Sequence, residues 1–234
     1  ALYGRNGESP MVVMAAHSPA HCFDAAFTAA KIAMEHMTPV LLLSEGFLGN
    51  GSEPWKIPTM SEYPEIKPRL AEADGNKFHP FERDPETLAR KWAPAGTPGL
   101  EHRVGGLEKT HNGVLSTDAA NHEMMVKERA EKVARVAADI PDLVVDGPES
   151  GDVLLVGWGG TYGHILTATE ELRAAGKTVS RVHFDFIDPL PKNTEKVLSG
   201  FRKIIVCELN LSCNKVQGQT FLVKEIVDAA LSEL

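Results

Sequence analysis

The 234-residue sequence has few cysteines, few aromatic residues and no excess of positive charge. Its three cysteines, Cys22, Cys207 and Cys213, contain no Cys-x-x-Cys pair, so this chain alone offers neither a zinc knuckle nor the four thiolates of an iron–sulfur cluster. A net charge of −8 argues against a nucleic-acid partner, because a duplex-binding surface needs clustered lysines and arginines. Free thiols and the absence of a signal peptide predict a cytoplasmic protein.

Long apolar runs and common catalytic motifs are also missing. The longest apolar runs, Pro39–Leu43 and Val153–Val156, are far shorter than the ~20 residues of a membrane span, so we expect no membrane association. The sequence lacks His-Glu-x-x-His, Gly-x-Ser-x-Gly and a Walker loop. His17 and His21 are four residues apart, but Pro19 lies between them, so a shared metal-binding face is not expected. We therefore predict no metal ligand.

The first pattern along the chain is a β-α-β unit. Met11–Ala16 predicts a buried strand, and Ser18 with Pro19 predicts the start of a helix that continues to His36. Val40–Leu43 predicts a second strand that is buried on both faces. Two strands and one helix cannot bury a core. We therefore expect further strands to come from residues before Ala1 or from another chain.

Residues 45–116 contain eight of the 15 prolines and show no sustained periodicity. A segment of this length without secondary structure is usually functional or disordered. Disordered linkers are poor in aromatic residues, whereas this segment is not. We interpret it as an ordered arm across a neighbouring domain or subunit, with a flexible linker as the alternative. Its aromatic residues are Trp55, Tyr63, Phe78, Phe81 and Trp92.

Asp118–Ile140 has the longest helical pattern in the sequence. Asp118 is a suitable N-cap, and Pro141 ends the helix. The spacing of four residues predicts the ion pairs Glu128–Lys132 and Glu131–Arg135.

From Val153 onward the predicted strands and helices alternate regularly, which is typical of an open parallel sheet covered by helices on both faces. We therefore predict a three-layer α/β domain in the second half of the chain. The predicted strands are Val153–Gly157, Val179–Phe184 and Ile204–Cys207, and the predicted helices are Tyr162–Ala175, Asn193–Leu198 and Phe221–Leu231.

The glycine-rich turn Gly157–Gly163 joins the first of these strands to the helix that follows. Such a turn allows the backbone to approach a phosphate, and Asp185 after the next strand could bind a ribose hydroxyl. The alternative is a tight packing turn in which Thr161 caps the helix. Glu208 follows a parallel strand at the edge where α/β sheets place ligands, and a structural acidic residue is the alternative there.

Arg5 lies in the loop Tyr3–Glu8, between glycines and just before the first strand. A guanidinium group can bind a carboxylate with two parallel hydrogen bonds. The alternative is that Arg5 pairs with Glu8 and stabilises the loop.

Several long motifs, in this order, resemble the alpha subunit of 2-oxoacid:ferredoxin oxidoreductases, and the 2-oxoglutarate branch is the most similar. The resemblance covers essentially the whole chain. Its motifs are Leu2–Glu8, Thr38–Ser44, Arg83–Arg90, Gly96–Lys109, Gly157–Gly163 and Asn214–Gln219.

The resemblance implies an enzyme subunit that takes part in the oxidative decarboxylation of 2-oxoglutarate to succinyl-CoA, or in the reverse reaction. It implies thiamine diphosphate with Mg²⁺ and a [4Fe–4S] cluster in the assembled enzyme, mostly held by partner chains or by residues before Ala1, and coenzyme A as co-substrate. It also implies a beta subunit, gamma and delta subunits in some assemblies, and ferredoxin as electron acceptor. The family's catalytic residues are expected before Ala1, so none is assigned here, and Arg5 is the candidate for substrate binding. The alternatives are a nucleotide-binding module that uses the Gly157–Gly163 turn and a non-catalytic structural subunit.

The resemblance further implies three regions. Residues 1–50 would be the last part of a pyrimidine-side thiamine-binding domain, and residues 51–140 the proline-rich arm and the long helix. Residues 141–234 would form a domain similar to the C-terminal domain of transketolases. The resemblance also implies that an additional strand and helix would lie between Ser212 and Cys213, where this sequence is short.

Overall fold

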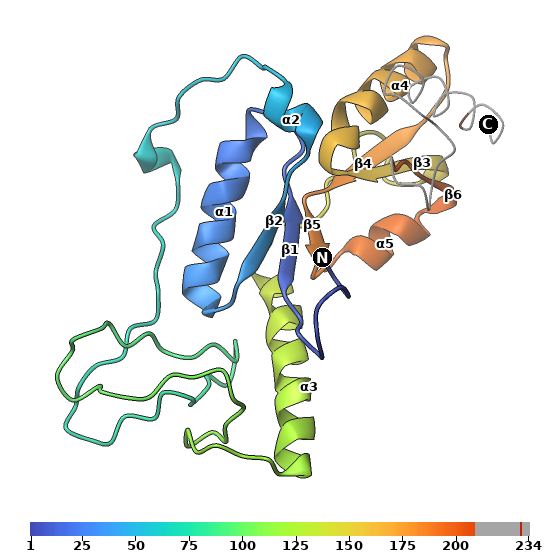
Figure 1. The fold of residues 1–234 in the computed structure, drawn as a ribbon. Helices are drawn as coiled ribbons and strands as arrows, with labels where there is room; N and C mark the ends of the chain where they lie inside the picture. The colour runs from blue at the N-terminus through green and yellow to red at the C-terminus, as the bar shows by residue number, and fades with distance from the viewer. Residues whose placement is uncertain (209–229, 231–234) are drawn as a thin grey trace. The chain divides into compact units, whose positions relative to one another are not determined.

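The computed structural model describes residues 1–208 and residue 230. The chain divides into two compact units, residues 1–13, 27–41 and 56–138 in the first and residues 14–26, 42–55 and 139–234 in the second. The described strands (Figure 1) are β1 (Val12–Ala15), β2 (Val40–Leu43), β3 (Gly151–Trp158), β4 (Ser180–Phe184), β5 (Phe186–Asp188) and β6 (Phe201–Val206). The described helices are α1 (His21–His36), α2 (Gly46–Asn50), α3 (Ala119–Arg135), α4 (Tyr162–Ala174), α5 (Thr194–Ser199) and the 3-10 turns η1 (Met60–Glu62), η2 (Val136–Ala138) and η3 (Gly159–Thr161).

In the first unit, α3 begins where the sequence predicts it. Asp118 has extended backbone dihedrals, and its carboxylate accepts a hydrogen bond from the Asn121 N–H at 2.9 Å. Met125 and Val133 are buried on the apolar face of the helix. The predicted pair Glu131–Arg135 is confirmed by an N–O distance of 2.8 Å.

The predicted pair Glu128–Lys132 is wrong. Glu128 pairs instead with the Arg83 guanidinium at 3.0 Å. The Lys132 ammonium is buried and donates to the carbonyl oxygen of Met37 at 2.7 Å. Because the helix face that carries both residues is covered by other parts of the unit, contacts from distant residues replace the pair within the helix.

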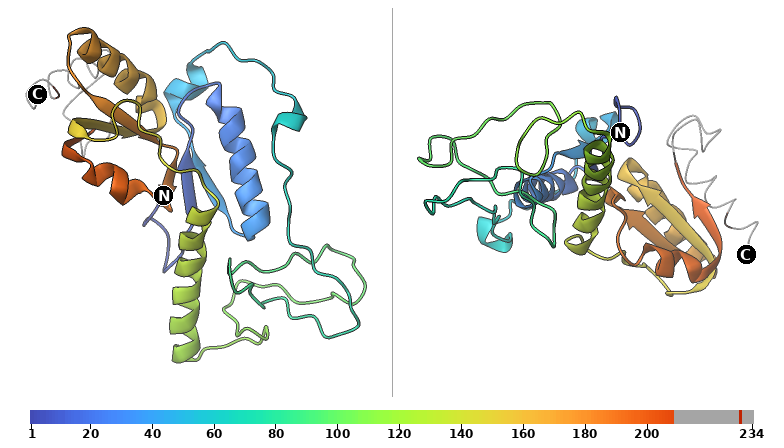
Figure 2. Two further views of the ribbon diagram at one scale, coloured as in Figure 1. Left: turned by 180° about the vertical axis from the view of Figure 1, so that it is seen from behind. Right: turned by 90° about the horizontal axis from the view of Figure 1, so that it is seen from below.

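The coil that precedes α3 (Figure 2) contacts α1 and α3 of its own unit, and the placement of an ordered arm across a neighbouring domain or subunit stays a prediction. The indole N–H of Trp92 donates to the Met34 carbonyl of α1 at 2.7 Å. The Arg135 guanidinium of α3 donates to the carbonyl oxygens of Pro85 and Glu86 at 2.8 and 2.9 Å. The Arg135 side chain of α3 therefore supplies donors to the backbone of this coil, and the coil's Trp92 side chain supplies a donor to the backbone of α1.

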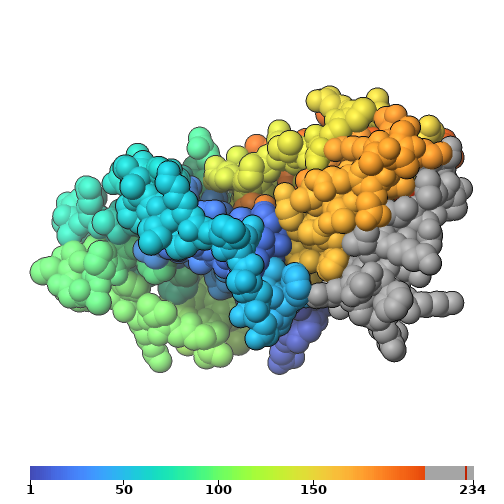
Figure 3. All heavy atoms as spheres, turned by 90° about the horizontal axis from the view of Figure 1, so that it is seen from above, coloured from blue at the N-terminus to red at the C-terminus, as the bar shows by residue number. Residues whose placement is uncertain are grey.

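The second unit contains a parallel sheet with the strand order β4-β3-β6. Leu154 of β3 is opposite Ser180 of β4 and Ile204 of β6. Alternate residues of β3 point to opposite faces, as the pleat of a strand requires. One core contains Val153, Leu155 and α4, and the other contains Leu154, Val156 and α5. The outer residues of α4 are exposed on one face of this unit (orange in Figure 3). The predicted three-layer α/β arrangement is confirmed.

A third strand joins β1 and β2. Where these two strands end in the second unit, the Ala15 N–H donates to the Asp185 carbonyl at 2.9 Å, and the Ala16 N–H donates to the Leu43 carbonyl at 3.0 Å. The sheet order is β2-β1-β5. The prediction that further strands come from residues before Ala1 or from another chain misses this source. β5 has three residues and follows β4 after Asp185 alone, so no turn sequence separates them.

The remaining strand and helix predictions agree with the structure to within a few residues, as far as it describes them. The predicted helix 221–231, the third cysteine Cys213 and the motif Asn214–Gln219 lie outside the described residues. Among the described helices, none combines the length and the apolar composition that crossing a bilayer requires.

Candidate functional site

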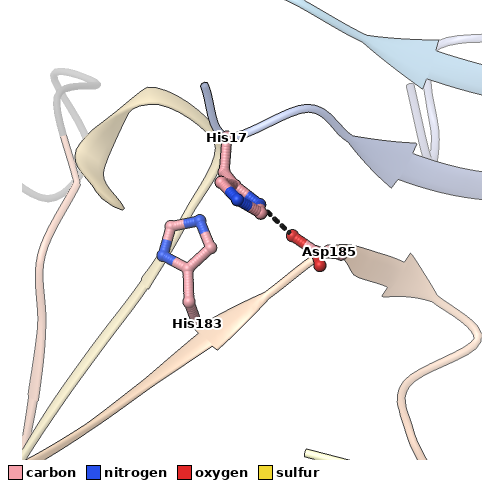
Figure 4. Close-up of side chains that lie close together, drawn as sticks. All are labelled: His17, His183 and Asp185. Atoms are coloured by element: carbon pink, nitrogen blue, oxygen red, sulfur yellow. Dashed lines mark hydrogen bonds and ion pairs between the residues drawn. The ribbon is translucent and has the colours of Figure 1, made fainter. Parts of the chain in front are cut away.

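The ends of β1 and β4 place a group of ionisable side chains together in the second unit. Val182 and Phe184 of β4 are buried in the core on the α5 side. Because side chains alternate along a strand, His183 and Asp185 share the opposite direction. His17 follows β1 and approaches both of them (Figure 4). The carboxyl end of a parallel strand is a common place for ligands in α/β proteins.

The closest contact in this group joins His17 to Asp185. The His17 Nδ1 atom lies 2.8 Å from the Asp185 Oδ1 atom. The His17 ring stacks on the His21 ring with a centroid distance of 3.7 Å and on the Tyr162 ring at 4.5 Å. The His21 Nδ1 atom accepts a hydrogen bond from the His17 N–H at 3.3 Å. These contacts fix the His17 ring from three sides.

Burial and charge act in opposite directions on the pKa values of this group. Burial lowers the pKa of His183 to about 3, so this imidazole is neutral at physiological pH. Burial and the charge of His17 lower the pKa of His21 as well. Burial by itself would raise the pKa of Asp185, but the hydrogen bond and charge of His17 outweigh it, and the pKa is lowered. The group therefore combines a carboxylate with a neutral imidazole.

A cavity of about 350 Å³ lies beside these residues and is lined by His17, Tyr162, His183 and Asp185 among others. Arg181 also lines it, but its guanidinium pairs with the Asp146 carboxylate at 2.7 Å and lies 5.0 Å from the Tyr162 ring centroid. Asp146 also pairs with Arg173 at 3.0 Å, so the positive charge of Arg181 is compensated in part. The arrangement can hold a cation or exchange a proton between imidazole and carboxylate.

The glycine-rich turn lines a second cavity of about 230 Å³. A Cβ atom on Gly160 would lie only 1.5 Å from the Glu45 Oε1 atom, so glycine leaves the space that this carboxyl group occupies. Glu208 lines the same cavity, and burial together with its charge raises the pKa of Glu45. Two carboxyl groups beside the turn disfavour the phosphate of a nucleotide.

The other predictions for this turn have mixed outcomes. Thr161 occupies the N-cap position of α4, but its side chain does not accept the expected bond and donates instead to the Trp158 carbonyl at 2.8 Å. The carboxylate of Asp185 is engaged with His17 rather than open for a ribose. The turn is therefore the packing turn of the second interpretation, closed by a different hydrogen bond.

Arg5 lies in the first unit and stabilises its own loop. Its Nε atom donates to the Ser9 carbonyl at 3.2 Å, and its terminal nitrogens donate to the Ser9 and Ala1 carbonyls. Sequence reasoning named Glu8 as the partner in such a loop, whereas the described partners are backbone oxygens. These bonds use part of the guanidinium fork.

Sequence reasoning treated His17 only in relation to His21 and did not single out His183. The signal that could have found it is a histidine and an aspartate two residues apart at the end of a predicted strand, in Val182-His183-Phe184-Asp185. Nothing in the sequence places that strand beside His17, which is 168 residues from Asp185.

Comparison with known proteins gives matches over the whole chain. The family model "Pyruvate flavodoxin/ferredoxin oxidoreductase, thiamine diP-bdg" matches residues 1–126. The 2-oxoglutarate oxidoreductase subunit KorA of Mycobacterium tuberculosis is 44% identical over 97% of this chain and 37% of its own length. The 2-oxoglutarate synthase subunit KorA of Methanothermobacter marburgensis is 25% identical over 100% of this chain and 60% of its own length. The chain thus spans 37% of the length of the first relative and 60% of the length of the second.

A solved structure shares the fold. The 2-oxoglutarate:ferredoxin oxidoreductase of Magnetococcus marinus, with 2-oxoglutarate, coenzyme A and succinyl-CoA bound, superimposes with a TM-score of 0.87 at 24% sequence identity. The match covers 100% of this chain and 44% of that chain.

Proposed function

Because this chain belongs to the pyruvate flavodoxin/ferredoxin oxidoreductase family of thiamine diphosphate-binding domains, we propose that it is part of the alpha subunit of a 2-oxoacid:ferredoxin oxidoreductase. We propose 2-oxoglutarate as the substrate, converted with coenzyme A to succinyl-CoA and carbon dioxide, or formed in the reverse direction. The observation that carries this proposal is the 44% identity to the mycobacterial KorA subunit across 97% of the chain. Fold similarity to a 2-oxoglutarate:ferredoxin oxidoreductase supports it.

The described residues do not by themselves fit the whole thiamine diphosphate molecule. The buried Glu45 Oε1 atom has no hydrogen-bond partner among the described residues. The pKa of Glu45 is raised, and a carboxyl group that keeps its proton more readily can donate a hydrogen bond to a ring nitrogen of the cofactor. The other ionisable group that lines this cavity is Glu208, which would repel a diphosphate. The described residues that line this cavity offer no cationic group for the diphosphate, so they do not hold the whole cofactor by themselves.

We propose that partner chains complete the enzyme. A [4Fe–4S] cluster needs four thiolates, and these 234 residues contain three cysteines, so the cluster would be held mostly by partner chains or by residues before Ala1. A beta subunit, with gamma and delta subunits in some assemblies, would supply Mg²⁺ and most contacts to thiamine diphosphate. Ferredoxin would accept the electrons one at a time. The free thiols of Cys22 and Cys207 suit the reducing cytoplasm.

Within this chain, we propose Arg5 as a residue that binds a carboxylate of the substrate. A 2-oxoacid dianion requires cationic partners, and guanidinium offers donors in a fork that matches a carboxylate. In the described loop, backbone carbonyls hold the Arg5 guanidinium, and these bonds position it while leaving donors for a ligand.

The activity is tested by co-expressing the protein that contains this chain with a beta subunit. We expect reduction of a one-electron dye that depends on both 2-oxoglutarate and coenzyme A. Omission of either substrate is the control. Absence of activity with every 2-oxoacid tested would refute the proposal.

The role of Arg5 is tested by the substitution Arg5→Lys, which keeps the charge and loses the fork. Transition-state binding of the dicarboxylate 2-oxoglutarate should weaken by ~1–3 kcal/mol, measured as kcat/KM, while that of the monocarboxylate pyruvate changes less. If Arg5 only holds its loop, both substrates are affected equally or neither is, and equal losses would remove Arg5 from the substrate site.

A further inference from the structure

We propose that His17, His183 and Asp185 form a binding site for one divalent transition-metal ion. The three side chains each offer one ligand atom, and these atoms all lie within 4.8 Å of one another (Figure 4). In a tetrahedral zinc site, metal–ligand distances of 2.0–2.2 Å place neighbouring ligand atoms about 3.3 Å apart. Small side-chain rotations therefore suffice to bring all three atoms to one ion.

The strongest single observation concerns His183. Both of its ring nitrogens are buried and lack a hydrogen bond of normal geometry to any described residue, although the Gly159 backbone is close enough to influence the ring. A buried polar atom without a partner is costly, which makes such an atom informative. An imidazole nitrogen without a partner is a possible metal ligand. A metal ion would satisfy one of the two nitrogens.

Neighbouring residues hold the proposed ligand side chains in position, as hydrogen-bonding partners of the ligands do in known metal sites. The stacked rings of His21 and Tyr162 hold the His17 ring in place. The His21 Nε2 atom lies 3.9 Å from the Asp185 Oδ2 atom, so a small movement would let it bind the carboxylate oxygen that the metal does not use. On metal binding, the proton shared by His17 Nδ1 and Asp185 Oδ1 would pass to His17 Nε2 or to solvent. The ion thus replaces an existing hydrogen bond.

The charges around the site favour a cation. Asp185 carries a negative charge among these residues, and Asp24 and Glu53 add negative charge near His21. Arg181 faces the cavity and pairs with Asp146 at 2.7 Å, but Asp146 also pairs with Arg173 at 3.0 Å, so part of the Arg181 charge still opposes a cation. Two imidazole nitrogens and one carboxylate oxygen suit zinc, iron, cobalt or nickel better than calcium or magnesium. The cavity of about 350 Å³ leaves room for water at a fourth position.

The experiment uses the whole 234-residue chain after treatment with a chelator. Zn²⁺ binding is measured by calorimetry, and Co²⁺ binding by visible absorption, because four- or five-coordinate cobalt with nitrogen ligands gives intense bands. We expect one Zn²⁺ ion per chain and intense cobalt bands. These two binding measurements on the unmodified chain test the proposal before any residue is substituted.

The variants His183→Ala and Asp185→Asn should each lower zinc affinity at least about tenfold. The matched control is His164→Ala, because His164 is another partly buried histidine of the second unit that lies outside the cluster. It should bind zinc like the unmodified chain, and circular dichroism checks that each variant is folded. Lack of saturable binding by the unmodified chain, or equal affinity in both ligand variants and the control, would overturn the proposal.

Discussion

Lys132 is a buried cation whose replacement should make stability less dependent on pH. Only 8% of the residue is exposed, and its ammonium group donates to the Met37 carbonyl. Burial, followed by the charges of Arg83 and Arg90, lowers the pKa of Lys132 from 10.5 to about 7. It pairs with no carboxylate among the described residues. The positive charge is therefore a cost to the folded state.

The sign of the pH dependence follows from linkage. Between about pH 7 and pH 10.5 the unfolded chain retains the proton on Lys132 while the folded chain has lost it, so the free energy of unfolding rises with pH. Below pH 7 both states are protonated, and the full cost of the buried charge remains. At about 1.36 kcal/mol for each pKa unit, this cost is at most about 5 kcal/mol. The hydrogen bond to Met37 offsets part of it, because it favours the charged form.

The substitution Lys132→Met removes the charge and keeps most of the side-chain volume. Near pH 6 we expect the variant to have a higher free energy of unfolding than the unmodified chain. The loss of the hydrogen bond to the Met37 carbonyl should reduce this gain by ~1–3 kcal/mol. This gain should shrink as the pH rises from about 7 toward 10. Urea unfolding at a series of pH values gives the difference in free energy directly.

The control is Lys127→Met on the same helix. The Lys127 side chain is 74% exposed and pairs with Glu123 at the surface, so its substitution should give a difference that is nearly constant over this pH range. A difference for Lys132→Met that is equally constant would refute the reasoning, because the buried ammonium would then keep its proton as readily as in water.

Two further substitutions test local features of the fold. Gly160→Ala should cost less than about 1 kcal/mol, because the Glu45 carboxyl that its Cβ would meet is the end of a flexible side chain and can move aside, and this small loss should disappear in a Glu45→Ala background; a larger loss that persists there in urea unfolding would contradict the contact. Asp118→Ala should cost about 1 kcal/mol through loss of the α3 cap, whereas Asp118→Asn, which keeps an acceptor, should cost less; equal losses in thermal unfolding would show that the cap is unimportant.

The parts of the fold that could be predicted from the sequence are those that local pattern determines. The strand β3 contains a run of buried apolar residues, and the regular alternation of strand and helix patterns after it identifies a parallel α/β sheet, although β6 is mostly exposed and carries Arg202 and Lys203. The Asp118 cap of α3 and the strand β1 were found in the same way. In each case the residues that determine the element are close together in the sequence.

Contacts between distant residues account for what the sequence did not predict. Glu128 and Lys132 have the spacing of an ion pair, yet Glu128 binds Arg83, and Lys132 binds a carbonyl 95 residues away. Met37, which supplies that carbonyl, has a positive φ of 47° just after α1 ends. The last carbonyls of a helix lack partners within the helix, and here a buried lysine supplies one. Spacing alone cannot show that a lysine on another helix is the stronger partner.

The candidate site also depends on contacts between residues that are distant in the sequence. His183 of β4 and Asp185 just after it are two residues apart, a spacing that favours the same side of an extended chain, and the sequence contains that information. Their meeting with His17 depends on β5, a strand of three residues that pairs with β1 and places Asp185 beside the end of that strand. Short strands have too few residues to show a period of two, so a strand like β5 is recognised only from its partner. The metal site that we infer therefore depends on the one strand of the described chain that sequence reasoning omitted, and the zinc titration tests the position of that strand as well as the chemistry of its neighbours.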